Sequence, residues 1–171
     1  MEITIITQSD LGVAEAEETG LSFVENALIK ARNAAKHTGL PALADDSGLE
    51  VDYLNGAPGV FSARYAGHQR NSIDNMKKLL FELDKIKNRN ARFRTVISFI
   101  MNGSETLFEG IVEGQIIKEP RGRLGFGYDP VFQPNGYTIS FAEMELNEKN
   151  EISHRGRAFT KLINFLNNTG A

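Results

Sequence analysis

The sequence predicts an α/β fold in which helices pack on a central mixed sheet. Helix-like and strand-like segments alternate in the first half of the chain, and an Asn-Gly turn signal joins two long strand-like segments in the middle. The chain has 171 residues, of which 41% are hydrophobic and 24% charged. This length and composition are typical of one globular domain with a substantial core, so we expect a single domain over residues 1–171.

Each element follows from a local pattern. Residues 2–7 alternate like a short strand, with Ile3 and Ile5 on one face. Ser22 and Glu25 form a capping box, so a helix should start there and run to about Thr38, where Gly39 ends it. Further along we expect strands over 41–45, 49–54, 92–101 and 105–118, and segment 105–118 should supply one further strand as well. We also expect a helix capped by Ser72, a loop over 120–134 and a helix over 156–168.

Composition narrows the function classes. The sequence contains no cysteine, which excludes disulfides and thiolate metal sites and favours a cytoplasmic protein. The N-terminal residues lack the basic and apolar regions of a secretory signal, and no apolar stretch approaches the roughly 20 residues of a membrane helix. The net charge of −3 argues against a general nucleic-acid binder but leaves a nucleotide substrate open.

The segment 43–67, LADDSGLEVDYLNGAPGVFSARYAG, carries the clearest chemical signal. Asp45 and Asp46 close an apolar strand, and alternation along a strand points neighbouring side chains to opposite faces. Carboxylate and phosphate oxygens are the ligands that Mg²⁺ prefers. A carboxylate beside the metal can also take a proton from an attacking water. Asp46-Ser47-Gly48 is equally typical of a plain turn, because all three residues favour turns.

Three other segments carry weaker signals, each with a purely structural alternative. Glu18 lies before the first helix, where an acid also favours the helix dipole, and Lys30 lies on that helix's polar face. The loop 124–130, LGFGYDP, offers an aromatic ring for stacking and an acid for base edges, or merely a tight connection. In 149–158, KNEISHRGRA, His and Arg are donors for purine carbonyls or phosphate, while Ser153 suits a helix N-cap.

The sequence lacks a P-loop, a GxGxxG fingerprint and an HExxH motif, so metal-assisted phosphoryl chemistry is the interpretation that these residues share. Taken together, EETGLSFVENALIKAR, the segment 43–67, GFGYDP and KNEISHRGRA closely resemble the inosine triphosphate pyrophosphatase family, from about Asp10 to Ala158. The match is nearest to its bacterial members that act on non-standard purines.

The resemblance implies a fold, a reaction and a set of roles. It implies an elongated mixed sheet with two lobes and a substrate cleft between them, usually as a homodimer. It implies Mg²⁺-dependent hydrolysis of ITP, dITP and XTP to the monophosphate and pyrophosphate. By motif, Asp46 matches the general base, and Glu18, Asp45 and Asp46 match the metal carboxylates. The implied substrate contacts are Lys30, Ser47, Arg64, Phe126, Gly127, Tyr128, Asp129, Lys149, His154 and Arg155.

The sequence departs from the family's pattern at its start. Members of the family begin with a strand, a Thr/Ser-x-Asn-x-x-Lys loop that grips the triphosphate, and a helix. This sequence matches only after that unit, which is compatible with a misassigned start, a truncation made for expression or a genuinely shortened relative. We expect weaker triphosphate binding and an apolar sheet surface that a dimer or larger assembly covers. Two alternatives to the pyrophosphatase remain: a purine nucleotide-binding protein with weak or no hydrolysis, and a hydrolase of another nucleotide such as a diphosphate.

Overall fold

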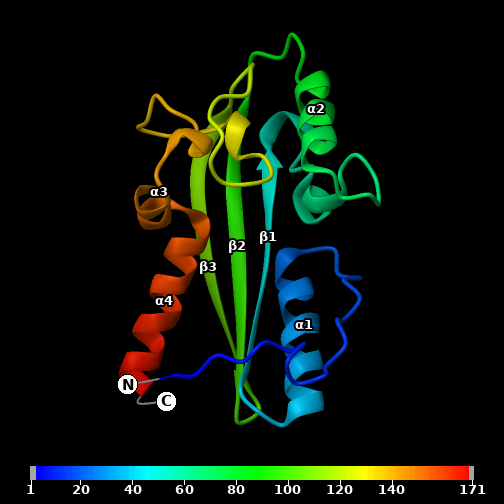
Figure 1. The fold of residues 1–171 in the computed structure, drawn as a ribbon, viewed down its shortest axis with the longest axis vertical. Helices are drawn as coiled ribbons and strands as arrows, with labels where there is room; N and C mark the ends of the chain where they lie inside the picture. The colour runs from blue at the N-terminus through cyan, green and yellow to red at the C-terminus, as the bar shows by residue number, and fades with distance from the viewer. Residues whose placement is uncertain (1–2, 170–171) are drawn as a thin grey trace.

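The computed structural model describes residues 3–169 and has a long antiparallel sheet at its centre (Figure 1). The sheet has four strands in the order β1-β2-β3-β4. Their bounds are Ala42–Val51, Asn90–Met101, Ser104–Ile116 and Phe132–Pro134. Every neighbouring pair is antiparallel, so the α/β class is confirmed, whereas the predicted mixed sheet is not found among the described strands.

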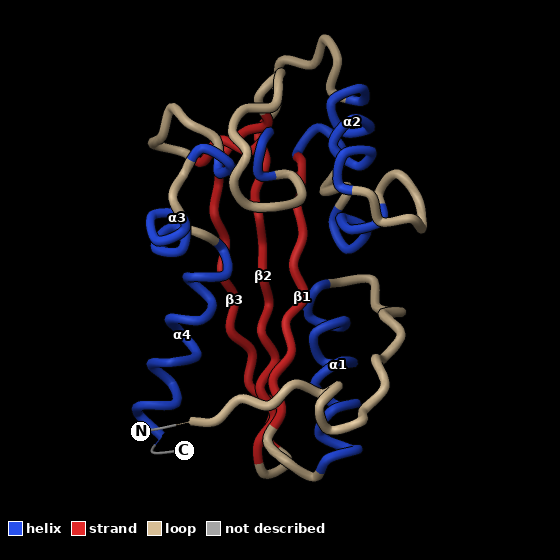
Figure 2. The backbone as a smooth tube through the Cα atoms, in the orientation of Figure 1, coloured by secondary structure: helices blue, strands red, loops and turns tan. Residues whose placement is uncertain are grey.

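Four α-helices flank this sheet in the described part of the chain: α1 (Phe23–Thr38), α2 (Ser72–Glu82), α3 (Leu146–Ile152) and α4 (His154–Thr169). Helices α1 and α4 lie on either side of the strands in Figures 1 and 2. Val96 packs with Phe23 and Ala27 of α1, whereas its neighbour Ile97 packs with Leu162 of α4. Alternation along β2 therefore gives each helix its own face of the sheet.

The hydrophobic core is divided along the strands. At one end, a large cluster contains Leu49, Phe93, Phe132 and Phe141. At the other end, smaller clusters lie under α1 and α4. Strands β1, β2 and β3 run through both ends, which gives the molecule the elongated shape seen in Figure 2.

Several predicted elements are confirmed. Helix α1 begins after Ser22, whose side chain accepts a hydrogen bond from the Glu25 backbone, and it ends at the left-handed Gly39. Asn102 and Gly103 join β2 to β3 with positive φ at both residues, as a two-residue hairpin turn requires. Helix α4 covers the predicted 156–168 and starts two residues earlier, at His154.

The predicted break between two strands at Gly48 is wrong, because this glycine makes room for a neighbouring segment and does not form a turn. The expected strands 41–45 and 49–54 are one continuous strand, β1, followed by a 3-10 turn. Gly48 does not turn the chain. A Cβ atom there would lie 2.4 Å from the Gly59 carbonyl oxygen and 2.7 Å from the Ser62 hydroxyl, so the glycine admits a close neighbouring segment.

The remaining differences concern ends and short elements. The predicted strand 2–7 is loop over its described residues, with Ile3, Ile5 and Ile6 exposed, and Glu2 lies outside the described residues. Asn71 rather than Ser72 caps α2. Segment 105–118 forms one strand, and the further partner is the short β4, inside the predicted loop. Among residues 3–169, no helix combines the length and apolar character needed to cross a membrane.

Candidate active site

Strand β1 places its two adjacent acids on opposite faces, as alternation predicts. Asp46 faces α1, where Lys30 Nζ lies 3.4 Å from its Oδ1. Asp45 faces α4, where an Arg155 guanidinium nitrogen lies 3.4 Å from its Oδ2. The two carboxylates therefore belong to two different groups of side chains on either side of one strand.

Glu18, Lys30, Asp46 and Arg64 form the first group, which we call the Lys30 cluster. Lys30 Nζ donates to Glu18 Oε1 at 2.7 Å and lies between Glu18 and Asp46. Arg64 lies 3.8 Å from the other Glu18 oxygen. Helix α1 supplies the lysine, β1 supplies Asp46, and the 3-10 segment Gly59–Arg64 supplies the arginine.

The two acids of the Lys30 cluster are tuned in opposite directions. Burial raises the pKa of Asp46, and Lys30 only partly offsets this effect. Burial also opposes ionisation of Glu18, but the hydrogen bond and charge of Lys30, helped by Arg64, hold the pKa of Glu18 below its usual value. Asp46 is consequently the better proton acceptor of the two.

Asn26 also belongs to this region. Its side chain is fully buried, and its Oδ1 accepts a hydrogen bond from the Gly20 backbone at 2.8 Å. Its Nδ2 and the Oδ2 of Asp46 are both buried without a hydrogen bond of normal geometry, but the Asn26 amide lies near enough to the Asp46 carboxylate to lower its pKa. Buried polar atoms normally find partners, so a small shift of either side chain, or a ligand, would complete the bonding here.

The donor set of the Lys30 cluster fits a magnesium ion. Mg²⁺ is commonly held by one or two carboxylates, with substrate phosphates completing its coordination. Glu18 and Asp46 supply two carboxylates near one point, and Asp46 has an unused oxygen. Within residues 3–169 no group of three or more histidine or acidic side chains is gathered that could hold a metal ion, and Asp45 lies on the other face. The three-carboxylate ligand set therefore stays a prediction.

Ser47 and Asp45 begin the second group of side chains. The Ser47 hydroxyl donates to Asp45 Oδ2 at 3.1 Å and shares a 2.6 Å hydrogen bond with the hydroxyl of Thr95. Thr95 is fully buried on β2. Arg155 then joins Asp45 to the first turn of α4.

A set of aromatic and basic side chains continues this group. Asp129 Oδ2 accepts from Lys149 Nζ at 2.5 Å and from the Phe126 backbone at 2.8 Å. Asp129 and Lys149 are both buried, whereas Phe126 is 63% exposed. Lys149 and Arg155 lie over the Phe126 ring, at 4.9 and 5.5 Å from its centroid. The loop thus presents an accessible ring with cations beside it.

His154 completes what we call the base pocket: Phe126, Asp129, Lys149, His154 and Arg155. Its ring stacks on Phe93 at 4.8 Å, and its Nδ1 is buried without a hydrogen-bond partner. Burial, with the charges of Arg155 and Lys149, lowers the pKa of His154 to about 3. The imidazole is therefore neutral at physiological pH, with one donor and one acceptor nitrogen.

Two predicted contacts lie differently from the rest. Tyr128 is buried in the larger core cluster, and its hydroxyl donates to the Ser62 carbonyl at 2.8 Å. The local 3-10 turn directs the Tyr128 ring inward while Phe126 stays outside, and a substrate contact by Tyr128 stays a prediction. Gly127 is a positive-φ residue between them and offers backbone only.

The sequence analysis missed two residues that the structure brings to the site. Asn26 precedes Lys30 by four residues on α1, so helix periodicity offered a signal for it. Thr95 reaches Ser47 only through the pairing of β1 with β2, and no local pattern indicates that register. Two hollows of about 500 and 390 Å³ on the surface contain none of the predicted site residues.

Comparison with known proteins identifies the lineage of this chain. The model of the Ham1 family matches residues 1–165. A dITP/XTP pyrophosphatase from Christiangramia forsetii is 53% identical over 165 residues, which cover 96% of this chain and 87% of the relative. The chain belongs to the Ham1 family.

Solved structures of Ham1 proteins agree with this assignment. A HAM1 protein from Coxiella burnetii superposes with a TM-score of 0.94 at 47% identity, covering 98% of this chain and 88% of that one. A nucleoside-triphosphatase / dITP/XTP pyrophosphatase from Mycobacterium abscessus gives a TM-score of 0.77 at 46% identity, covering 90% and 80%. The family resemblance of the sequence motifs is thus confirmed.

Proposed function

We propose that this Ham1 protein hydrolyses dITP, XTP and ITP to the monophosphate and pyrophosphate. The observation that carries the proposal is the arrangement of two groups around β1: the Lys30 cluster on one face and the base pocket on the other, joined by the neighbouring Asp45 and Asp46. A nucleotide has the same two parts, a charged phosphate chain and a planar base. The names of the relatives support the same substrate class.

In this proposal, Asp46 is the general base that takes a proton from the water attacking the α-phosphorus. Its raised pKa suits the role, because a carboxylate with a higher pKa is a stronger base. Lys30 and Arg64 bind phosphate oxygens and offset the charge that builds up on the leaving pyrophosphate.

Glu18 and Asp46 would hold Mg²⁺, with Asp45 as the third carboxylate expected from the family resemblance. When bound, the ion supplies Lewis-acid stabilisation of phosphate charge. Ser47 orients Asp45 through its hydroxyl and lies at the boundary between the two groups.

The base pocket would select a 6-oxo purine. The exposed Phe126 ring provides a stacking surface, and Lys149, His154 and Arg155 are donors suited to a carbonyl oxygen at position 6. An adenine presents an amino group at the same position, which cannot accept these hydrogen bonds. Such a mismatch leaves buried donors unpaired, which is how polar sites reject close analogues.

The first experiment is a hydrolysis assay of the 171-residue chain with Mg²⁺. Inosine, guanosine and adenosine triphosphates are compared, and pyrophosphate and orthophosphate are measured separately. Pyrophosphate released from inosine triphosphate faster than from adenosine triphosphate supports the proposal, and the rate on guanosine triphosphate, which shares the 6-oxo group, shows whether a 2-amino group is also rejected. Orthophosphate as the only product, or equal rates on all three nucleotides, contradicts it.

The second candidate is a protein that binds purine nucleotides without hydrolysing them. The observation that favours it is Lys30, which already pairs with both Glu18 and Asp46 and so occupies the space between the proposed metal carboxylates. Calorimetry showing binding of inosine monophosphate, together with no triphosphate turnover, would establish this alternative. We also propose a homodimer, one domain per chain and a cytoplasmic location, following the family resemblance and the cysteine-free sequence.

A further inference from the structure

Three small residues lie side by side across the sheet at the level where its core divides. Ser47, Thr95 and Gly110 pair in register on β1, β2 and β3. The next level on the same face toward one end is Leu49, Phe93 and Val112, and toward the other end Asp45, Ile97 and Phe108. The row is therefore a shallow gap between the large core cluster and the cluster under α4.

The first turn of α4 enters this gap at Gly110. A Cβ atom on Gly110 would lie 1.9 Å from the backbone oxygen of His154 and 2.7 Å from the backbone nitrogen of Ala158. Both neighbours are main-chain atoms, so a larger residue can be admitted only if the helix itself moves. Glycine is required here by close approach, since its backbone conformation is that of an ordinary strand.

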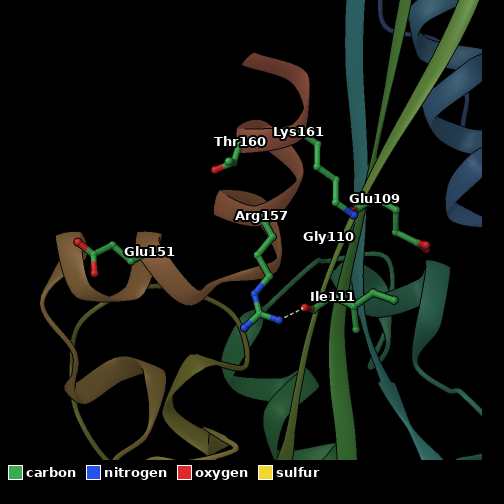
Figure 3. Close-up of a pocket in the computed structure, with 7 residues that line it drawn as sticks. All are labelled: Glu109, Gly110, Ile111, Glu151, Arg157, Thr160 and Lys161. Atoms are coloured by element: carbon green, nitrogen blue, oxygen red, sulfur yellow. Dashed lines mark hydrogen bonds between the residues drawn. The ribbon is translucent and has the colours of Figure 1, made fainter. Parts of the chain in front are cut away.

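Two basic side chains of α4 fasten the helix to the carbonyls on either side of Gly110. Arg157 Nη1 donates to the carbonyl of Ile111 at 2.7 Å, and Lys161 Nζ donates to the carbonyl of Glu109 at 2.7 Å. Figure 3 shows both side chains reaching from the helix toward β3. They line the hollow of about 500 Å³ beside the strand.

The residues next to these contacts are two that the proposed function assigns to the base. His154 and Arg155 are the first two residues of α4, immediately before Gly156 and Arg157. Their positions are precise: His154 lies nearly parallel to Phe93, at 12°, and Arg155 contacts both Asp45 and the Phe126 ring. A shift of the first turn moves both donors together.

We propose that Gly110, held against α4 by Arg157 and Lys161, is a specificity-determining positioning residue. It sets where His154 and Arg155 meet the purine, without touching the nucleotide itself. This inference rests on the base pocket of the proposed function. Discrimination between purines then depends on the contact between Gly110 and the first turn of α4 as well as on the donors that bind the purine.

The test replaces Gly110 by alanine and compares dITP with dATP. For Gly110→Ala we expect the ratio of kcat/KM values, dITP over dATP, to fall about tenfold or more, because small displacements of positioned donors have effects of this size. The matched control is Gly114→Ala on the same strand, where the new Cβ would lie 2.4 Å from the Gln133 carbonyl oxygen and presses on β4 instead. The control should lose stability but keep the selectivity ratio.

A second variant keeps the inference testable if Gly110→Ala does not fold. Arg157→Met removes one hydrogen bond to β3 from an exposed side chain and should lower the same ratio less strongly. Its control is Arg32→Met, which removes hydrogen bonds between α1 and Glu105 on the same strand. The inference is overturned if Gly110→Ala has the same selectivity ratio as Gly114→Ala. If Gly110→Ala does not fold, the inference is overturned if Arg157→Met has the same ratio as Arg32→Met.

Failure of the proposed function gives a different pattern. If the unmodified chain releases no pyrophosphate from dITP, the proposed function fails, and calorimetric binding of inosine and adenosine monophosphates replaces turnover as the readout. Loss of inosine preference in Gly110→Ala, with preference kept in Gly114→Ala, then still supports the positioning role. Equal preference in both variants, or no preference in the unmodified chain, overturns it.

Discussion

Asp46 shows how one residue's surroundings set its chemistry. It is mostly buried beside α1, its Oδ2 has no partner, and burial raises its pKa above that of a surface aspartate. Glu18 contacts the same lysine, yet its pKa is lowered. Environments that separate the pKa values of neighbouring acids are typical of sites where one acid accepts a proton and another stays ionised.

We predict that Asp46→Asn lowers kcat by about 10²–10⁴-fold, the usual contribution of a general base. Asparagine keeps the shape of the side chain, so the thermal unfolding temperature should change little. The control is Asp52→Asn, an exposed aspartate paired with Arg92. Turnover of Asp46→Asn equal to that of the control would remove Asp46 from the mechanism.

His154 predicts a pH dependence of stability. Its pKa is about 3 in the folded protein against an ordinary 6.5, so between these values the unfolded chain binds more protons than the folded one. The stabilisation is complete above pH 6.5 and is lost as pH falls toward 3. Between pH 7 and 5.5 this effect removes about 1 kcal/mol from the free energy of unfolding.

The measurement is urea unfolding of the unmodified chain and of His154→Gln at both pH values. The variant lacks the titrating imidazole, so its free energy of unfolding should fall by about 1 kcal/mol less over this range. His68→Gln is the control, because it removes a histidine whose surroundings are largely solvent. Parallel pH curves for His154→Gln and the unmodified chain would contradict the prediction.

The sequence supplied most residues of the candidate site by type and motif, because short-range patterns carry that information, and their roles stay predictions. It could not show that Lys30 joins Glu18 and Asp46, since these residues come from a loop, a helix and a strand. Nor could it show that a single 3-10 turn directs the Tyr128 ring into the core. Thr95 was missed because strand register is set by distant packing.

At the scale of elements, the two ends of α4 differ: the first turn carries candidate site residues, and the later turns pack into the core. Its first turn presents His154 and Arg155, and its later turns bury Ala158 and Leu162 against β2 and β3. The apolar spacing predicted the buried face of this helix. The start at His154 agrees with the N-cap role that the sequence offers for Ser153, whose hydroxyl accepts a hydrogen bond from the Gly156 backbone at 3.1 Å.

Leu162→Ala should lower the free energy of unfolding by about 2–4 kcal/mol, because the leucine is 3% exposed and its removal leaves a cavity. The neighbouring Ile163 is 53% exposed, so Ile163→Ala on the same helix is the control and should cost about 0.5 kcal/mol or less. Urea unfolding measures both. Equal losses in the two variants would mean that α4 does not pack as described.

Strand β1 illustrates why element boundaries are difficult to read. Asp46, Ser47 and Gly48 resemble a turn, yet they remain extended because each is paired with β2 over the whole length of the strand. Tertiary pairing overrides local turn preference here. The same pairing brings Ser47 to Thr95 and keeps Asp45 and Asp46 on opposite faces.

At the scale of the whole molecule, the core regions share strands. The cluster around Phe132 and Phe141 and the clusters under α1 and α4 are separate, but β2 contributes residues to all three, and β3 contributes to the large cluster and to the one under α4. The Asn102-Gly103 turn predicted the antiparallel pairing of β2 with β3, but periodicity says where strands lie and not how they pair, so the places of β1 and β4 in the sheet could not be predicted.

We expect the two core regions to unfold together. Tyr128 lies in the larger cluster, and the chain contains no tryptophan, so tyrosine fluorescence reports mainly on that end. Circular dichroism reports on all the helices and strands. Coincident urea transitions by the two probes would indicate one cooperative unit, and separate midpoints would show that the shared strands do not couple the ends.

The continuous strands have a consequence for movement between the two ends of the molecule. Bending between the two ends would disrupt the β1–β2 and β2–β3 ladders, which span the level of Ser47, Thr95 and Gly110. We therefore expect the two ends of the sheet to move as one body, because neither end can swing toward the other without breaking backbone hydrogen bonds of these ladders.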